Sequence, residues 1–203
     1  MSDQGDMHNN QSAGEMVPGR ECGTCTLCCK VFRIDEVESP PGKWCRHCTP
    51  GRGCTIHETR PPVCRGFFCL WFYQPGLGPE WKPEKSKIVL NLELNGQRLA
   101  AHVDTSVPGA WRRSPYYEVL KRWSADAIAR QQQVSVWIGR QCIVILPDRE
   151  IDLGVVGEDE IVVSTTRMTP QGPEHGAEKI KASEVAAKQR EWAAAKQRFA
   201  AGS

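Results

Sequence analysis

The chain has 203 residues and a formal net charge of +2, with 26 Lys and Arg against 24 Asp and Glu. This near balance argues against a general polyanion-binding protein, so we expect no nucleic-acid partner. The sequence contains no run of eighteen apolar residues that would predict a membrane span, and its hydrophobic content of 40% is enough for a modest core.

The first segment, residues 1–19, is polar and is predicted to be a disordered tail. It lacks the basic start and the apolar stretch of a secretory signal, so we expect a cytoplasmic protein. Thiols persist in the reducing cytosol, where structural disulfides are rare. Ten cysteines in such a protein therefore indicate metal binding.

Nine of these cysteines fall within residues 20–74, a segment without sustained periodicity that is broken by proline and glycine. We predict an irregular module with little core of its own, in which bound metal supplies the missing stabilisation. Its first cluster is Cys22-Gly-Thr-Cys25-Thr-Leu-Cys28-Cys29. A C-x2-C turn lets two sulfurs converge on one ion, and C-x2-C-x2-C also opens the bacterial ferredoxin run. Because consecutive side chains diverge, one of Cys28 and Cys29 is expected to serve a second centre or to support the first.

The second cluster begins with Cys45-Arg-His-Cys48, again a metal-knuckle spacing, and Cys54 and Cys64 are able to complete a tetrahedral set. The candidate metal ligands are Cys22, Cys25, Cys28, Cys29, Cys45, Cys48, Cys54, Cys64 and Cys69. Basic residues outnumber acidic ones here, so they could offset the negative charge of a thiolate site and donate hydrogen bonds to it. The basic residues are Lys30, Arg33, Lys43, Arg46, Arg52, Arg60 and Arg65.

The block CGTCTLCCKVF…KWCRHCTPGRGCTIHETRPPVCRGFFCLWF, about residues 20–74, resembles the bacterial YkgJ-type cysteine-cluster family. That family is described as zinc- or iron-chelating proteins with a CxxCxxCC domain. The resemblance implies a zinc ion or an iron–sulfur cluster held by Cys22, Cys25, Cys28, Cys29, Cys45, Cys54 and Cys64. Cys48 and Cys69 are less general features of the family, which usually has tyrosine at the position of His57.

Other readings of the cysteine block stay open at this point. The same cysteines could form disulfides, or a C-x-x-C pair could be a redox pair, although a thioredoxin-like site needs a βαβ context that this segment lacks. His47 or His57 could replace one thiolate. Cys142 stands apart in an apolar stretch opposite Trp137 and is predicted to be a buried structural thiol.

Residues 75–165 have the patterns of an α+β domain with antiparallel hairpins. Apolar residues alternate over 88–94, and Asn95-Gly96 predicts a type I′ turn that pairs this strand with residues 98–103. Ser114-Pro115 has the form of an N-cap followed by proline at the first helical position, which predicts a helix to residue 130. Residues 134–138 and 142–146 predict a second hairpin, and 161–164 a short strand. His102 is expected to be exposed.

Residues 166–203 are predicted to be a linker followed by a C-terminal helix over 177–201, where strong helix formers dominate. Val185, Trp192 and Phe199 recur every seven residues as a seam for docking.

The sequence as a whole predicts an α+β fold and a cytosolic metal-binding protein that holds zinc or an iron–sulfur cluster. The alternative is an iron–sulfur redox or metal-dependent enzyme, acting in electron transfer or protein modification. A protein partner is compatible with either function.

Overall fold

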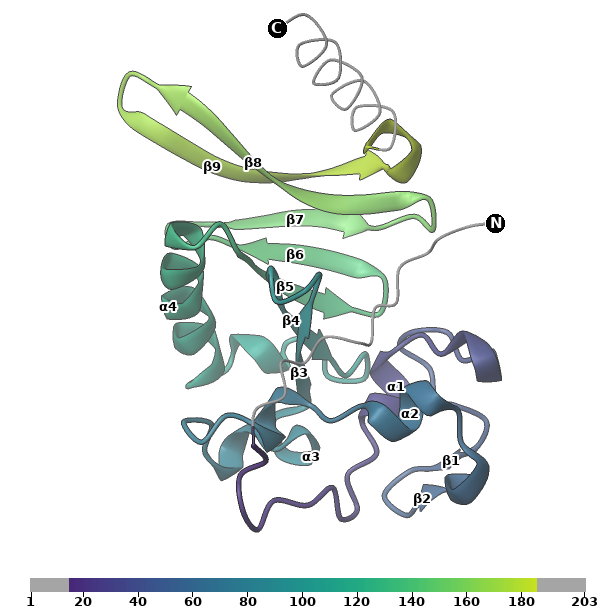
Figure 1. The fold of residues 1–203 in the computed structure, drawn as a ribbon. Helices are drawn as coiled ribbons and strands as arrows, with labels where there is room; N and C mark the ends of the chain where they lie inside the picture. Colours follow the sequence, from purple (N-terminus) through teal and green to yellow (C-terminus); the bar gives the residue numbers. More distant parts are fainter. Residues whose placement is uncertain (1–14, 186–203) are drawn as a thin grey trace, which may run out of the picture.

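The computed structural model of the protein describes residues 15–185, and in this range helices and strands alternate around a five-stranded sheet (Figure 1). The α-helices are α1 (Cys28–Val31), α2 (Pro62–Gly66), α3 (Pro83–Ser86) and α4 (Tyr116–Ala129). The strands are β1 (Cys48–Thr49), β2 (Gly53–Cys54), β3 (Ile88–Glu93), β4 (Arg98–Val103), β5 (Gln133–Ile138), β6 (Gln141–Ile145), β7 (Glu150–Val155), β8 (Glu160–Thr169) and β9 (Gly172–Lys181). Short 3-10 helices connect them: η1 (Asp35–Val37), η2 (His57–Thr59), η3 (Leu70–Phe72), η4 (Pro79–Trp81) and η5 (Ala110–Arg112). The α+β class is confirmed.

The main sheet has the strand order β3-β4-β5-β6-β7, and it is mixed where the sequence predicted antiparallel pairing throughout. The difference lies between β4 and β5, which pair in parallel. A parallel connection requires a crossover, and α4 supplies it between the two strands. The predicted strand, helix and strand are thus all present, but they form a βαβ unit in which the two strands pair in parallel.

The first predicted hairpin is confirmed in its register. Leu92 pairs with Leu99, Leu90 with Ala101 and Ile88 with Val103. Asn95 and Gly96 have φ angles of 56° and 82°, the positive values that the two central residues of a type I′ turn need. The second hairpin, β5 with β6, is also found as predicted.

The two faces of the sheet have different covers. Ile88, Leu90 and Ile143 pack on the side of α4, where Leu120 is fully buried. The alternate residues point the other way: Val89 packs into the cysteine-rich region, whereas Cys142 and Val144 pack in a cluster with Val162 of β8. Figure 1 shows the cysteine-rich region beside β3 and the β8–β9 hairpin beyond β7.

The start of α4 differs from the prediction. Pro115 occupies the N-cap position, Tyr116 is the first helical residue, and no side chain caps the helix. The apolar stripe is nevertheless correct, because Tyr116, Leu120 and Ala127 are buried and Trp123 packs against the same core.

The C-terminal part of the described chain corrects two predictions. The expected short strand is the ten-residue strand β8, and the expected loop at 170–176 and start of a helix at 177 are largely strand β9. Ala177 favours helix in isolation, but it pairs with Ser164 across the hairpin and packs beside Cys142 and Val144. Tertiary pairing outweighs the weak intrinsic preference here. Residues 182–185 are helical, and the rest of the predicted helix, with Trp192 and Phe199, lies outside the described residues.

The predicted tail over 1–19 also lies mostly outside the described residues. Within its described part, the Val17 N–H donates to the carbonyl of Phe72. Across residues 15–185, no helix combines the length and apolar character needed to cross a membrane.

Candidate metal centre

The cysteine-rich region has an apolar core that sequence reasoning did not foresee. Leu27, the N-cap residue of α1, and Val31, its last residue, pack with Phe32, Phe72 and Val89 of β3. All five side chains are buried. The expectation of little core in this region is therefore wrong, because scattered aromatic residues find apolar partners on the sheet.

Backbone hydrogen bonds draw separate cysteine motifs together. Gly23 has a φ of +55° inside the first C-x2-C turn, where the Cys25 N–H donates to the Cys22 carbonyl at 2.9 Å. The Cys45 N–H donates to the Cys29 carbonyl, also at 2.9 Å. Cys48 and Cys54 pair directly across β1 and β2. These bonds place cysteines from three sequence motifs beside one another.

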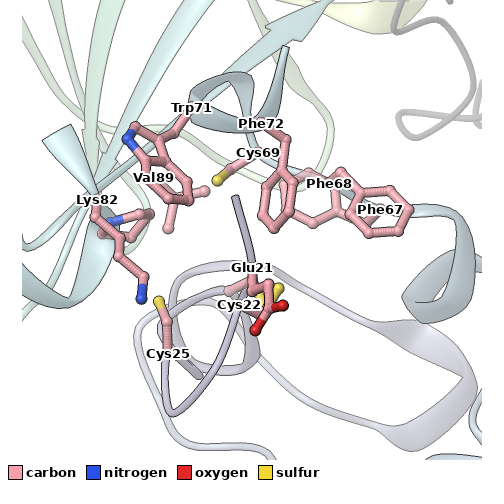
Figure 2. Close-up of a pocket in the computed structure, with 12 residues that line it drawn as sticks. Glu21, Cys22, Cys25, Phe67, Phe68, Cys69, Trp71, Phe72, Lys82 and Val89 are labelled. Carbon is pink, nitrogen blue, oxygen red and sulfur yellow. The ribbon is translucent and has the colours of Figure 1, made fainter. Parts of the chain in front are cut away.

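The thiols fall into two groups according to their mutual interactions. The pocket group comprises Cys22, Cys25 and Cys69, which line one pocket (Figure 2) and whose charges act on one another, although the charge of Cys29 also acts on Cys22. The hairpin group comprises Cys29, Cys45, Cys48, Cys54 and Cys64. Cys28 lies between the groups, since it lines the same pocket as Cys22 and hydrogen-bonds with Cys29.

The thiols of the hairpin group influence one another's protonation. Burial raises the pKa of Cys48 although interaction with Thr26 lowers it, and interaction with Cys28 raises the pKa of Cys29. All ten cysteines are free thiols, with no disulfide among them. Electrostatic coupling between thiols from different motifs is compatible with a shared metal centre.

Burial raises the pKa of most of these thiols. It brings the pKa of Cys48 and of Cys69 to about 12 and that of Cys64 to about 11, with the charges of neighbouring cysteines adding to the effect. The hydrogen bond from Cys29 to Cys28 and burial raise the pKa of Cys29 as well. A cation is what would stabilise thiolates in this environment, since thiolates are the metal-binding form.

Within residues 15–185, no three His, Cys, Asp or Glu side chains converge closely enough to hold one metal ion as they stand. Two observations nevertheless fit a bound soft metal. Thiolates are the preferred ligands of zinc and of iron–sulfur clusters. Arg60 Nε is buried without a hydrogen-bond partner, and the Arg60 charge lowers the pKa of both Cys22 and Cys29. A metal-bound thiolate would give this donor an acceptor.

A buried ion pair fixes α1 against the sheet. Lys30 follows directly after Cys28 and Cys29, and its Nζ donates to Asp104 and to Ser106 just beyond β4. The side chains of Lys30 and Asp104 are 7% and 11% exposed. Lys30 Nζ also lies 5.4 Å from the ring centroid of Trp44, beside Cys45. Lys30, which the sequence suggested only as a balancing charge, therefore positions both cysteine motifs.

The histidines differ from their sequence expectations. His57 is exposed beside Glu58, and His47 accepts a hydrogen bond from Arg46, so neither replaces a thiolate in this arrangement. The prediction that His102 is exposed is wrong: its side chain is only 13% exposed, and its Nε2 lies 2.8 Å from Glu93 Oε1. It packs against Phe32 of the cysteine-rich region, which explains its burial.

The outlying cysteine fits its prediction. Cys142 is fully buried in β6, pairs with Trp137 across the hairpin, and packs with Val144 and Leu146. Burial brings its pKa to about 12. It stands outside both cysteine groups.

Comparisons with family models, with curated proteins and with solved structures found no match to the chain.

Proposed function

We propose that the chain is a YkgJ-type protein that binds zinc or an iron–sulfur cluster through its cysteine-rich region. One observation carries the proposal: Arg60, whose buried Nε lacks an acceptor, acts electrostatically on the free thiols Cys22 and Cys29. Thiolates formed on metal binding would satisfy that nitrogen, and the arginine charge would offset theirs.

Metal binding in this region requires side-chain rotation as well as deprotonation. A cysteine has three staggered χ1 positions, so its sulfur can turn toward a shared ion without a change in the backbone. The ligands we propose are Cys22, Cys25, Cys28, Cys29, Cys45, Cys48, Cys54, Cys64 and Cys69. The backbone around them is already fixed by the bond from Cys45 to Cys29 and by the Lys30–Asp104 pair.

Free thiols at this density support a reducing compartment, and we propose a cytoplasmic location. The alternative to a binding protein is an iron–sulfur redox or metal-dependent enzyme. The identity of the metal separates the two, because zinc has no redox chemistry and a cluster has. Anaerobic purification with elemental analysis and an absorption spectrum makes the distinction: broad visible absorption with bound iron indicates a cluster, and colourless protein with zinc indicates a closed binding site.

Cys64→Ser is expected to lower the bound metal by about one equivalent per folded protein, because serine is a poor soft-metal ligand at neutral pH. The measurement is elemental analysis of anaerobically purified protein, with folding checked by circular dichroism.

Cys142→Ser is the matched control, because it makes the same chemical change at a cysteine outside both groups. It should keep the wild-type metal content and lose only the modest stability expected when a hydroxyl enters an apolar strand. Wild-type protein that carries neither zinc nor iron after anaerobic purification, with its cysteines in disulfides, would refute the proposal.

A further inference from the structure

Within residues 15–185, the main sheet covers only one face of the β8–β9 hairpin. Val162 of β8 is buried against Cys142 of the main sheet, and Ala177 of β9 packs in the same cluster. Because successive residues of a strand point to opposite faces, Ile161 and Val163 point away from the sheet. The two strands form a sheet of their own, which Figure 1 shows as a long ribbon beyond β7. The hairpin therefore has an outer face that the main sheet does not cover.

Apolar side chains lie on this outer face at the base of the hairpin. The outer face comprises Ile161, Val163, Thr165 and Arg167 of β8 and the residues opposite them, Ile180, Glu178, Gly176 and Glu174 of β9. Ile161 is 37% exposed, and none of Ile161, Val163 and Ile180 belongs to an apolar cluster of the described chain. A hairpin of two strands is marginally stable in water unless a further layer covers its apolar face. These three residues thus form an apolar surface that a covering segment would stabilise.

The chain leaves the described range beside this apolar surface. β9 ends at Lys181, directly after Ile180. The Ala182 N–H then donates to the Asp159 carbonyl at 2.8 Å, which holds the next residues at the base of the hairpin. Residues 186–203 follow; as a helix they would span about 27 Å, whereas the outer face extends about 20 Å along β8. The segment is therefore attached at one end of the outer face and is long enough to cover it.

The sequence of this segment complements the outer face. Trp192 and Phe199 follow Val185 at intervals of seven residues, so a helix would carry all three along one side. The charged residues of the segment are Lys188, Arg190, Lys196 and Arg198 against Glu191. The hairpin has the opposite balance over residues 158–181, with Glu158, Asp159, Glu160, Glu174 and Glu178 against Arg167, Lys179 and Lys181. Glu178 is exposed on the outer face itself, so this face favours a basic partner.

We propose that residues 186–203 fold back as a helix over the outer face of the β8–β9 hairpin in the same chain. The side of the helix that carries Val185 and Trp192 packs on the apolar surface at the base of the hairpin, and the basic side chains lie near Glu178. Attachment to the end of β9 favours this occupant over a second copy of the chain, because the tether gives the segment a high effective concentration at the face. The inference goes beyond the proposed metal binding and does not depend on it.

Photo-crosslinking in the full chain tests this contact. The probe p-benzoylphenylalanine, incorporated at Trp192, reacts on irradiation with the side chains that it touches, and mass spectrometry locates the product. We expect cross-links to residues 158–181 within one chain, which stays a monomer on a denaturing gel. The same probe at Ala194 is the matched control, because a position two residues farther along a helix lies close to its opposite side. The control should give little of this product.

Hydrogen exchange in the full chain gives a second measurement that needs no probe. The double variant Trp192→Ser with Phe199→Ser should uncover the outer face, so exchange of the β8–β9 amides should become about tenfold faster. Ala194→Ser, the control, should leave exchange unchanged. Cross-links that join two chains, or that fall outside residues 158–181, would overturn the inference, as would unchanged exchange in the double variant. These outcomes would leave the proposed function standing, because none of them measures metal.

Discussion

Replacing Asp104 with alanine is expected to lower the free energy of unfolding by about 3–5 kcal/mol, because it leaves the Lys30 ammonium buried without its counter-charge. The Lys30 side chain is 7% exposed, so water cannot take the place of the carboxylate. Asp104 also accepts the Ser106 N–H at 2.8 Å, which orders the turn after β4. Chemical denaturation monitored by circular dichroism measures the loss.

The control for this variant is Asp148→Ala, which removes an aspartate from a surface pair. Asp148 is 65% exposed beside Arg149, and such pairs contribute about 0–1 kcal/mol. The double variant Lys30→Met with Asp104→Ala should recover part of the stability, since no unpaired charge remains. If the double variant is as unstable as Asp104→Ala alone, the loss does not come from the buried ammonium. In Asp104→Ala, hydrogen exchange should also be faster at the Cys45 N–H, which donates to the Cys29 carbonyl beside Lys30.

Local patterns in the sequence were sufficient for much of the sheet. Period-two alternation and the Asn95-Gly96 turn gave the register of β3 and β4, since both are properties of neighbouring residues. The pairing of Cys142 with Trp137 follows for the same reason. The parallel β4–β5 pair was missed because it depends on where α4 returns the chain, which no local pattern states. The β8–β9 hairpin was missed because Ala, Glu and Lys favour helix locally, whereas packing on the sheet decides the outcome.

The candidate site was predictable in composition but not in arrangement. The C-x2-C spacings identified the thiols, and the surplus of basic residues pointed to Lys30 and Arg60. Sequence alone could not show that Lys30 pairs with Asp104, 74 residues away, or that Cys69 faces Cys22 and Cys25. Cys69 was a weaker candidate, like Cys48, because both are less general features of the family that the block resembles. Its signal was the aromatic run around it, Phe67, Phe68, Trp71 and Phe72, which forms the wall of the pocket.

Glu93→Gln is expected to destabilise the protein by about 3 kcal/mol at neutral pH, because it removes a buried charge that pairs with the Arg98 guanidinium and hydrogen-bonds with His102. Burial alone would raise the pKa of Glu93, but the hydrogen bond with His102 and the charges of His102 and Arg98 outweigh it, so its pKa lies below the usual value. The Arg98 Nη1 lies 3.6 Å from the carboxylate and the His102 Nε2 lies 2.8 Å from it, and the Cys142 thiol is also close enough for the Glu93 charge to act on it. Arg98 in turn donates to Gln133 and to the Val162 carbonyl, which ties the pair to the β8–β9 hairpin.

The pH dependence of this effect has a definite sign. A carboxylate whose folded pKa is lowered stabilises the protein above its unfolded pKa, about 4.3 for glutamate, and that stabilisation is lost as pH falls through the folded pKa. The stability difference between the wild type and Glu93→Gln should therefore be constant near neutral pH and shrink as pH falls below about 4. Urea denaturation at a series of pH values measures it. Glu158→Gln is the control, because Glu158 is 69% exposed in its pair with Arg33, and its difference from the wild type should stay within about 1 kcal/mol throughout. A Glu93→Gln difference that grows as pH falls would show that the carboxylate opposes folding, and the buried network of Glu93, Arg98 and His102 would then have to be maintained by packing against Phe32 and Trp137 instead of by charge.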